Sequence, residues 1–97
     1  MNTATAFVGD TQIATTDDAV IVEGNVYFPE SDVVDGVLVA NRSKSLCFWK
    51  GIASYYDVAA GGITLRSAAF TYRHPSPLAR RIKGRIAFWN GVDVRSS

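Results

Sequence analysis

The chain of 97 residues has little of the chemistry that often holds a small protein together or anchors it to a membrane. Cys47 is the only cysteine and His74 the only histidine, which excludes an intramolecular disulfide and leaves too few soft ligands for a structural zinc site. No apolar run approaches the ~20 residues of a membrane-spanning helix, and residues 1–14 have no basic segment followed by a long apolar one. We therefore expect no metal or other cofactor, no membrane partner and a cytoplasmic location.

Positive charge is missing from the first part of the chain. Residues 1–41 carry seven acids and no Lys or Arg, whereas residues 42–97 carry ten bases against Asp57 and Asp93, so net charges of −7 and +8 sum to +1. Two explanations stay open: acidic and basic strands that lie side by side and partly neutralise one another, or an anion-binding face. A net charge this close to zero argues against nucleic acid as the main partner.

Helical patterns are also scarce, and the chain offers one short helical signal. Ser76 suits the N-cap position, Pro77 the first helical position and Gly84 the position just after the end. The pattern predicts one short helix near residues 77–83, with Leu78 and Ile82 on its inner face.

The chain does have glycine turns at regular intervals. Five dipeptides suited to tight reversals separate apolar runs of strand length: Gly9-Asp10, Gly24-Asn25, Asp35-Gly36, Gly61-Gly62 and Asn90-Gly91. With 47 % hydrophobic residues and no linker or repeat, residues 1–97 are expected to form a single domain. The spacing predicts a mainly β fold built from antiparallel sheets.

These turns also predict which side chains share a face of a sheet. A turn at Gly9-Asp10 collects four apolar side chains on one side: Ala4, Ala6, Val8 and Ile13. A turn at Gly61-Gly62 pairs Ala60 with Ile63, Val58 with Leu65 and Asp57 with Arg66, and it turns four side chains inward: Tyr56, Val58, Ile63 and Leu65. A hairpin at Asn90-Gly91 would create an apolar face of Ala87, Trp89, Val92 and Val94.

The segment 47–57 reads Cys-Phe-Trp-Lys-Gly-Ile-Ala-Ser-Tyr-Tyr-Asp and resembles the signature of the domain of unknown function 427 family. Members of that family typically read Cys-Pro-Trp/Tyr-Lys-Gly-x-Ala-x-Tyr-Tyr/Trp there, so Phe48 stands in the usual proline position. The resemblance continues through residues 23–29, 68–72 and 82–88, where Phe70 replaces a frequent tryptophan. It implies antiparallel sheets in a β-tent-like arrangement and brings with it a nucleotidyltransferase-like label.

The chain has no motif that supports the chemistry of that label. Phosphoryl transfer commonly uses a glycine-rich phosphate loop or paired carboxylates that hold magnesium. Gly61-Gly62 is better explained as a hairpin turn, and Asp17 and Asp18 would face opposite ways on a strand.

Large side chains with polar tips concentrate around Lys50, which lies between an aromatic residue and a glycine. Our leading hypothesis is a pocket that binds a small anionic or polar metabolite, with Tyr55 preferred over Tyr56 because the predicted register turns Tyr56 inward. The candidate ligand-binding residues are Cys47, Trp49, Lys50, Gly51, Tyr55, Tyr72 and Lys83. Each also has a structural interpretation: core packing for the rings, a solvated lysine, a β-bulge at Gly51 and a buried, inert thiol.

Two other classes of function stay open. The chain fits a structural or interaction module that forms a homodimer through an exposed sheet edge. It also fits an enzyme that uses the Cys47 thiol, with His74 as the only histidine available as a base, or that has a nucleotidyltransferase-like activity.

Overall fold

The computed structural model describes residues 2–96, and these residues form nine strands and two short 3₁₀ helices. The strands are β1 (Ala4–Val8), β2 (Thr11–Thr16), β3 (Val20–Val22), β4 (Asn25–Phe28), β5 (Leu38–Cys47), β6 (Gly51–Ala60), β7 (Ile63–Thr71), β8 (Ile86–Phe88) and β9 (Asp93–Ser96). The 3₁₀ helices are η1 (Glu30–Asp32) and η2 (Pro77–Ile82).

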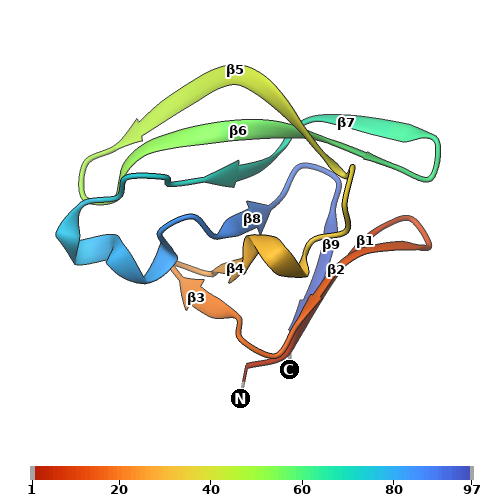
Figure 1. Ribbon diagram of the computed structural model, residues 1–97, viewed down its shortest axis with the longest axis horizontal. Helices are drawn as coiled ribbons and strands as arrows, with labels where there is room; N and C mark the ends of the chain where they lie inside the picture. The colour runs from red at the N-terminus through yellow and green to blue at the C-terminus, as the bar shows by residue number, and fades with distance from the viewer. Residues whose placement is uncertain (1, 97) are drawn as a thin grey trace.

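The strands form two sheets in which every neighbouring pair is antiparallel. The larger sheet has six strands in the order β3-β4-β8-β7-β6-β5. In Figure 1 it extends from the edge strand β5 to the edge strand β3. The smaller sheet has three strands in the order β2-β1-β9. The predicted mainly β fold with antiparallel sheets is confirmed, while its β-tent-like arrangement stays a prediction.

The main core lies where the two sheets meet. Ala6 and Ile13 of the small sheet pack in one buried cluster with Phe28, Val58 and Ile86 of the large sheet. The predicted face at the first glycine turn is confirmed, because Ala4, Ala6, Val8 and Ile13 are all buried.

A second, smaller cluster covers the other face of the large sheet and positions the candidate site. Ala79 and Ile82 of η2 pack there against Tyr27, Tyr72 and Ala87. Trp49, Tyr55 and Phe70 lie at the margin of this cluster and are only partly buried.

The short helix forms where the sequence predicts it, but with a different inner face. Leu78 is 80 % exposed, so its predicted place on that face is wrong. The segment Pro77–Ile82 consists of 3₁₀ turns that join at a kink at Ala79, where φ is −117° and ψ is 21°, and the residues it buries are Ala79 and Ile82, not Leu78. Ser76 does not cap the helix with its side chain; its hydroxyl donates instead to the Trp49 carbonyl.

The hairpin predicted at Asn90-Gly91 is wrong, although the chain does turn there. The Val92 N–H donates to the Trp89 carbonyl at 3.2 Å, as in a tight turn. The flanking strands then separate: β8 pairs with β4 and β7, whereas β9 pairs with β1 in the other sheet. β8 thereby gains a partner on both sides and full burial, which a two-stranded hairpin does not provide.

The hairpin predicted at Gly61-Gly62 is confirmed close to the turn, where Ala60 pairs with Ile63 and Val58 with Leu65. Beyond Val58 the register shifts, so Asp57 does not lie opposite Arg66. Asp57 instead accepts hydrogen bonds from the Ser67 N–H and the Asn41 amide, both at 2.9 Å. The inward position predicted for Ile63 is also wrong, because this residue, next to the turn of the hairpin, is 50 % exposed.

Acidic and basic parts of the chain meet in the fold. Within residues 2–96, two ion pairs join them, Lys50 with Glu23 and Arg85 with Asp18. This contact between the two parts favours the first of the two explanations for the uneven charge.

Candidate functional site

Lys50 occupies the last position of the turn that joins β5 to β6. Cys47 pairs with Gly51, so residues 48–50 form the turn. Gly51 has a φ of +112°, and a Cβ added there would lie 3.3 Å from the His74 carbonyl oxygen. The Ser76 N–H donates to the Lys50 carbonyl at 3.0 Å, which holds the segment before η2 against this turn.

The Lys50 side chain is buried and paired. The residue is only 6 % exposed, and its ammonium group donates to Oε1 of Glu23. The other carboxylate oxygen of Glu23 accepts a hydrogen bond of 3.3 Å from the Trp49 indole. Lys50 Nζ also lies 5.5 Å from the ring centroid of Trp49 and 5.6 Å from that of Tyr72, within the range of cation–π attraction.

Glu23 reaches Lys50 from a two-residue turn between β3 and β4. Val22 pairs with Asn25, and both turn residues have positive φ, 53° at Glu23 and 80° at Gly24. A positive φ is uncommon for a residue other than glycine. The sequence predicts a turn at Gly24-Asn25, whereas the structure places it one residue earlier at Glu23-Gly24. The one sequence feature that pointed to Glu23 is its place in a block shared with the family.

Both members of the ion pair are charged near neutral pH. The hydrogen bond from Lys50 holds the pKa of Glu23 below its usual value. Burial acts to lower the pKa of Lys50, but the hydrogen bond to Glu23 and the nearby Tyr27 and Tyr72 outweigh it, so that pKa is raised. Lys50 therefore offers a protonated hydrogen-bond donor and not a neutral amine nucleophile.

A cavity of about 220 Å³ opens beside this ion pair. Its lining residues come from separate strands and turns: Asn25, Lys50, Tyr55, Phe70, Tyr72 and Trp89. Phe70 lies at the centre of the aromatic group, with ring centroids 5.9 Å from Tyr55, 6.2 Å from Tyr72 and 6.5 Å from Trp89. The volume is below the ~300–1,000 Å³ typical of sites for drug-sized ligands, so the cavity suits a small molecule.

Only some polar groups of the cavity are available to a ligand. The Tyr55 hydroxyl is hydrogen-bonded to the Ser45 hydroxyl at 2.9 Å, and the Trp89 indole donates to the Ser67 carbonyl at 2.8 Å. Among residues 2–96 no side-chain hydrogen bond is found for Tyr72 or for the Asn25 amide. The available groups are therefore the Lys50 ammonium, the Tyr72 hydroxyl and the Asn25 amide.

The predicted site residues fall into two groups. Lys50, Tyr55 and Tyr72 line the cavity, and Trp49 contacts the Lys50–Glu23 pair beside it. Gly51 shapes the turn without lining the cavity. Lys83 does not come together with the others, because its side chain is exposed and only its backbone bridges to Tyr72.

Sequence reasoning did not place Asn25, Phe70 or Trp89 in the cavity. Asn25 was assigned to a turn and Trp89 to a hairpin face, and both assignments depended on register. Phe70 had one signal, its place in a shared block at a position where the family often has tryptophan.

Cys47 and His74 are not brought together in the way a catalytic pair requires. The Cys47 thiol packs half-buried at the margin of the second cluster, while the His74 side chain is exposed. In the part of the chain that the structure describes, no hydrogen bond joins them. Thiol chemistry at Cys47 stays a prediction.

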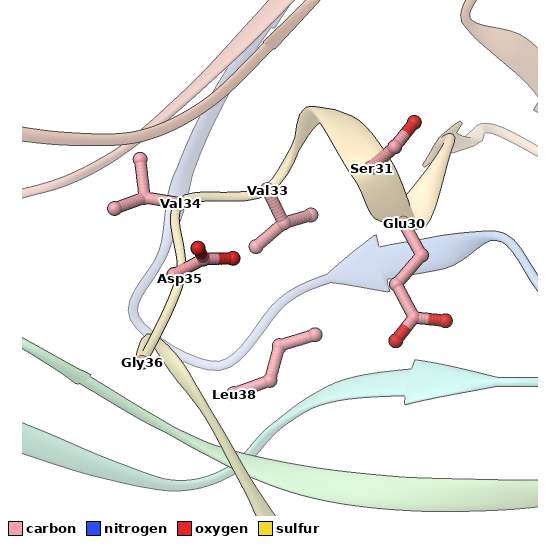
Figure 2. A pocket seen from close by; sticks show the side chains of 7 residues that line it. All are labelled: Glu30, Ser31, Val33, Val34, Asp35, Gly36 and Leu38. Carbon is pink, nitrogen blue, oxygen red and sulfur yellow. The ribbon is translucent and has the colours of Figure 1, made fainter.

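A larger hollow of about 480 Å³ lies next to η1 (Figure 2). In this view Glu30 and Ser31 border it on the right and Asp35 on the left, with the apolar side chains of Val33 and Leu38 between them. All three polar side chains are exposed. A shallow site of this kind holds no buried charge or donor that would fix a ligand, so we place the candidate site at Lys50.

Comparison with family models matches residues 2–96 to a family described as a domain of unknown function, DUF427. The chain belongs to this family. A search of curated proteins finds no match. Within residues 2–96, no helix is long and apolar enough to cross a membrane.

The fold brings together the separated blocks by which the chain resembles the DUF427 family. Residues 23–29 supply Glu23 and Asn25, residues 47–57 supply Lys50 and Tyr55, and residues 68–72 supply Phe70 and Tyr72. Of the two departures from the family pattern, Phe48 is fully exposed at the tip of the β5–β6 turn and Phe70 lies inside the cavity. The shared residues thus gather around one site.

Proposed function

We propose that this DUF427 domain binds a small anionic or polar metabolite with a planar ring in the cavity beside Lys50. The main support is the pairing of a buried ammonium group with four aromatic rings around one small cavity. The rings offer apolar surface to a planar ligand, and Lys50 and Tyr72 offer hydrogen-bond donors that fix its orientation.

The ion pair shapes the kind of ligand that fits. Glu23 neutralises the charge of Lys50, so the site does not present an isolated positive charge. A ligand is then held mainly by hydrogen bonds and ring contacts, and a polar neutral molecule fits as well as a small anion.

The experiment is a thermal-shift screen of the purified protein against nucleobases, pyridines, aromatic carboxylates and sugar phosphates. A ligand that binds the folded state raises the melting temperature. Lys50→Met should abolish the shift, whereas Lys83→Met, at the exposed lysine outside the cavity, should retain it. A screen without any shift contradicts the proposal, as does a ligand whose effect depends on Lys83 and not on Lys50.

A cytoplasmic location belongs to the same proposal. The free thiol of Cys47 suits a reducing compartment, and nothing in the described fold depends on a disulfide.

A second candidate function is self-association through β5, supported by the exposed apolar side chains at the end of this edge strand. Leu46 and Ile52 pair across the β5–β6 hairpin and are 72 % and 56 % exposed, and Phe48 extends from its tip. Light scattering tests this candidate. Leu46→Lys should abolish a dimer and Ile21→Lys, on the opposite edge strand β3, should retain it, whereas a wild-type chain that is monomeric at all concentrations contradicts it.

A further inference from the structure

Four large apolar side chains are exposed at one end of the molecule, and we call them the apolar tip. Phe48 is fully exposed in the β5–β6 turn, and Leu46 and Ile52, which pair with each other beside this turn, are 72 % and 56 % exposed. Leu78 at the start of η2 is 80 % exposed. Figure 1 shows the β5–β6 turn and the start of η2 at the same end of the molecule, on the left. Exposed apolar groups that gather in this way commonly mark an interaction surface.

Hydrogen bonds hold together the two segments that carry the apolar tip. The Ser76 N–H donates to the Lys50 carbonyl at 3.0 Å, and the Ser76 hydroxyl donates to the Trp49 carbonyl. Phe48 directly precedes Trp49, and Leu78 follows Ser76 by two residues. The apolar tip is therefore a convex end built from a turn and the start of a short helix, and not a groove.

Positive charge dominates the two segments that meet at this end. Residues 42–56 contain three bases and residues 72–85 contain five, and neither segment contains an acid. Glu23, which contacts the turn from outside these segments, is already paired with Lys50. Asp10 lies in the β1–β2 turn, at the opposite end of the molecule in Figure 1.

Three exposed bases flank the apolar tip. Lys44 lies two residues before Leu46 on β5 and therefore on the same face of the strand. Arg80 and Arg81 follow Leu78 on η2. In the described part of the chain no ion pair involves any of these three bases, so their charges are available to an anionic partner.

We infer that this end of the domain docks on a lipid surface with anionic headgroups, with Phe48 inserted at the boundary of the acyl chains and the flanking bases against the headgroups. Burial of apolar side chains and attraction to anionic lipids add up in contacts of this kind. A convex end can enter a lipid surface without a partner of matching shape, whereas a protein partner needs a complementary surface. The contact needs no membrane-spanning segment, and it replaces the expectation of no membrane partner, which depended on the absence of one.

A second copy of the chain is the competing occupant of the apolar tip. A two-fold dimer through this end places the same surface of both copies face to face. The bases at Lys44, Arg80 and Arg81 would then approach bases of the partner, and like charges across an interface weaken it. An anionic lipid surface attracts the same bases, so the charge of this end favours the lipid surface.

Flotation with lipid vesicles tests the inference. The purified protein is mixed with vesicles of phosphatidylcholine alone or of phosphatidylcholine with phosphatidylserine, and the bound fraction gives a partition coefficient. We expect binding to the vesicles with phosphatidylserine and a loss of most of it at about 1 M NaCl, where the Debye length is only about 3 Å. Absence of binding, or equal binding to both kinds of vesicle, overturns the inference.

The variant Phe48→Ser tests the apolar contact. The melting temperature should not change, because Phe48 is fully exposed, while the partition coefficient should fall about tenfold or more with the loss of a buried phenylalanine ring. Ile63→Ser is the matched control, since Ile63 is 50 % exposed beside the β6–β7 turn at the other end of the molecule in Figure 1, and it should bind as the wild type does. Equal partition of Phe48→Ser and the wild type overturns the inference.

The double variant Arg80→Ser, Arg81→Ser tests the contact with the headgroups. Each base that approaches an anionic lipid surface strengthens binding, so the partition coefficient should fall about fivefold for each charge removed. Arg66→Ser removes an exposed base on β7, outside the two basic segments, and should have little effect. An unchanged partition coefficient in the double variant overturns the part of η2 in docking.

Two further measurements distinguish a lipid surface from a second copy. Brominated lipids quench tryptophans that enter the acyl region, so Phe48→Trp should gain a quenched fluorophore and Ile63→Trp should not. Light scattering without lipid should show that Phe48→Ser and the wild type have the same mass. A dimer that Phe48→Ser dissociates would assign the apolar tip to a second copy and would overturn the inference.

Discussion

Lys50 and Glu23 form an ion pair across 27 positions of sequence, and the two partners differ sharply in burial. The side chain of Lys50 is 7 % exposed and that of Glu23 52 %. Glu23 thus brings a carboxylate from a solvent-facing turn to a buried cation. The pair connects the β3–β4 turn to the β5–β6 turn, and these two turns border the candidate cavity.

Glu23→Gln should destabilise the protein, because it leaves the buried Lys50 ammonium without its carboxylate. The measurement is the urea midpoint of unfolding at pH 7. Asp93→Asn is the matched control, since the Asp93–Arg95 pair is exposed on both sides and contributes little. An equal decrease of the urea midpoint in the two variants would contradict a stabilising role that is specific to the Lys50–Glu23 pair.

The free energy of unfolding should decrease as the pH rises above 10.0, the ordinary pKa of tyrosine, and Tyr27 should contribute to this decrease. The pKa of Tyr27 is raised from 10.0 to about 12 in the fold, so between these values the unfolded chain releases a proton that the folded chain retains. Unfolding then becomes easier as the pH rises, by at most about 2 to 3 kcal/mol for a shift of this size. The raised pKa of Lys50 acts in the same direction above its ordinary value of 10.5.

Urea unfolding at pH 9, 10 and 11 measures this slope. Tyr27→Phe should show a shallower decline than the wild type, because one of the three groups whose pKa is raised in the fold, Tyr27, Lys50 and Tyr72, is gone. Tyr55→Phe serves as the comparison, since this ring is only partly buried. A decline of the same slope in Tyr27→Phe would show that the burial of Tyr27 does not matter for the pH dependence.

Asp57 should hold the irregular register of β6 and β7 in place. Its carboxylate accepts the Ser67 N–H at 2.9 Å at the point where the register shifts, and Ser67 has a positive φ of 50°. This backbone hydrogen bond and the one from Asn41 lower the pKa of Asp57, so its contribution should be lost as the pH falls below the ordinary value of 3.8.

Asp57→Ala should therefore speed hydrogen exchange of the Ser67 amide and lower the stability of the protein. Asp57→Asn retains an acceptor oxygen and should have a smaller effect on that amide. Exchange at Ser67 that is equally slow in Asp57→Ala and in the wild type would contradict the role of the carboxylate.

The register at Asp57 also shows why part of the fold could be predicted from the sequence and part could not. Close to Gly61-Gly62 the turn geometry alone determines the pairs, and Ala60–Ile63 and Val58–Leu65 were predicted correctly. Beyond Val58 a bulge changes which residues lie opposite one another, and no local sequence pattern indicates this bulge. At this turn the prediction held for residues 58–60 and 63–65 and failed beyond them.

The same limit applies to the candidate site. Lys50 and Tyr55 could be predicted because they lie in one continuous segment that resembles the DUF427 family. Glu23 and Trp89 could not, because their contribution depends on how distant turns come together. The hairpin expected after Trp89 failed for a related reason: the pattern of apolar residues does not tell which sheet a strand joins.

The 3₁₀ geometry of η2 makes a prediction that separates it from an α-helix. Residues three apart share a face in 3₁₀ turns, and in η2, which has a kink at Ala79, Ala79 and Ile82 are buried while Leu78 is 80 % exposed. Ile82→Ala should cost about 2 to 5 kcal/mol, as expected for a large residue in a well-packed core. Leu78→Ala should change the unfolding free energy by no more than about 0.5 kcal/mol, as for most surface positions. An α-helix would place Leu78 and Ile82 on the same face, so similar losses in the two variants, measured by urea unfolding, would show that η2 has α-helical packing in solution.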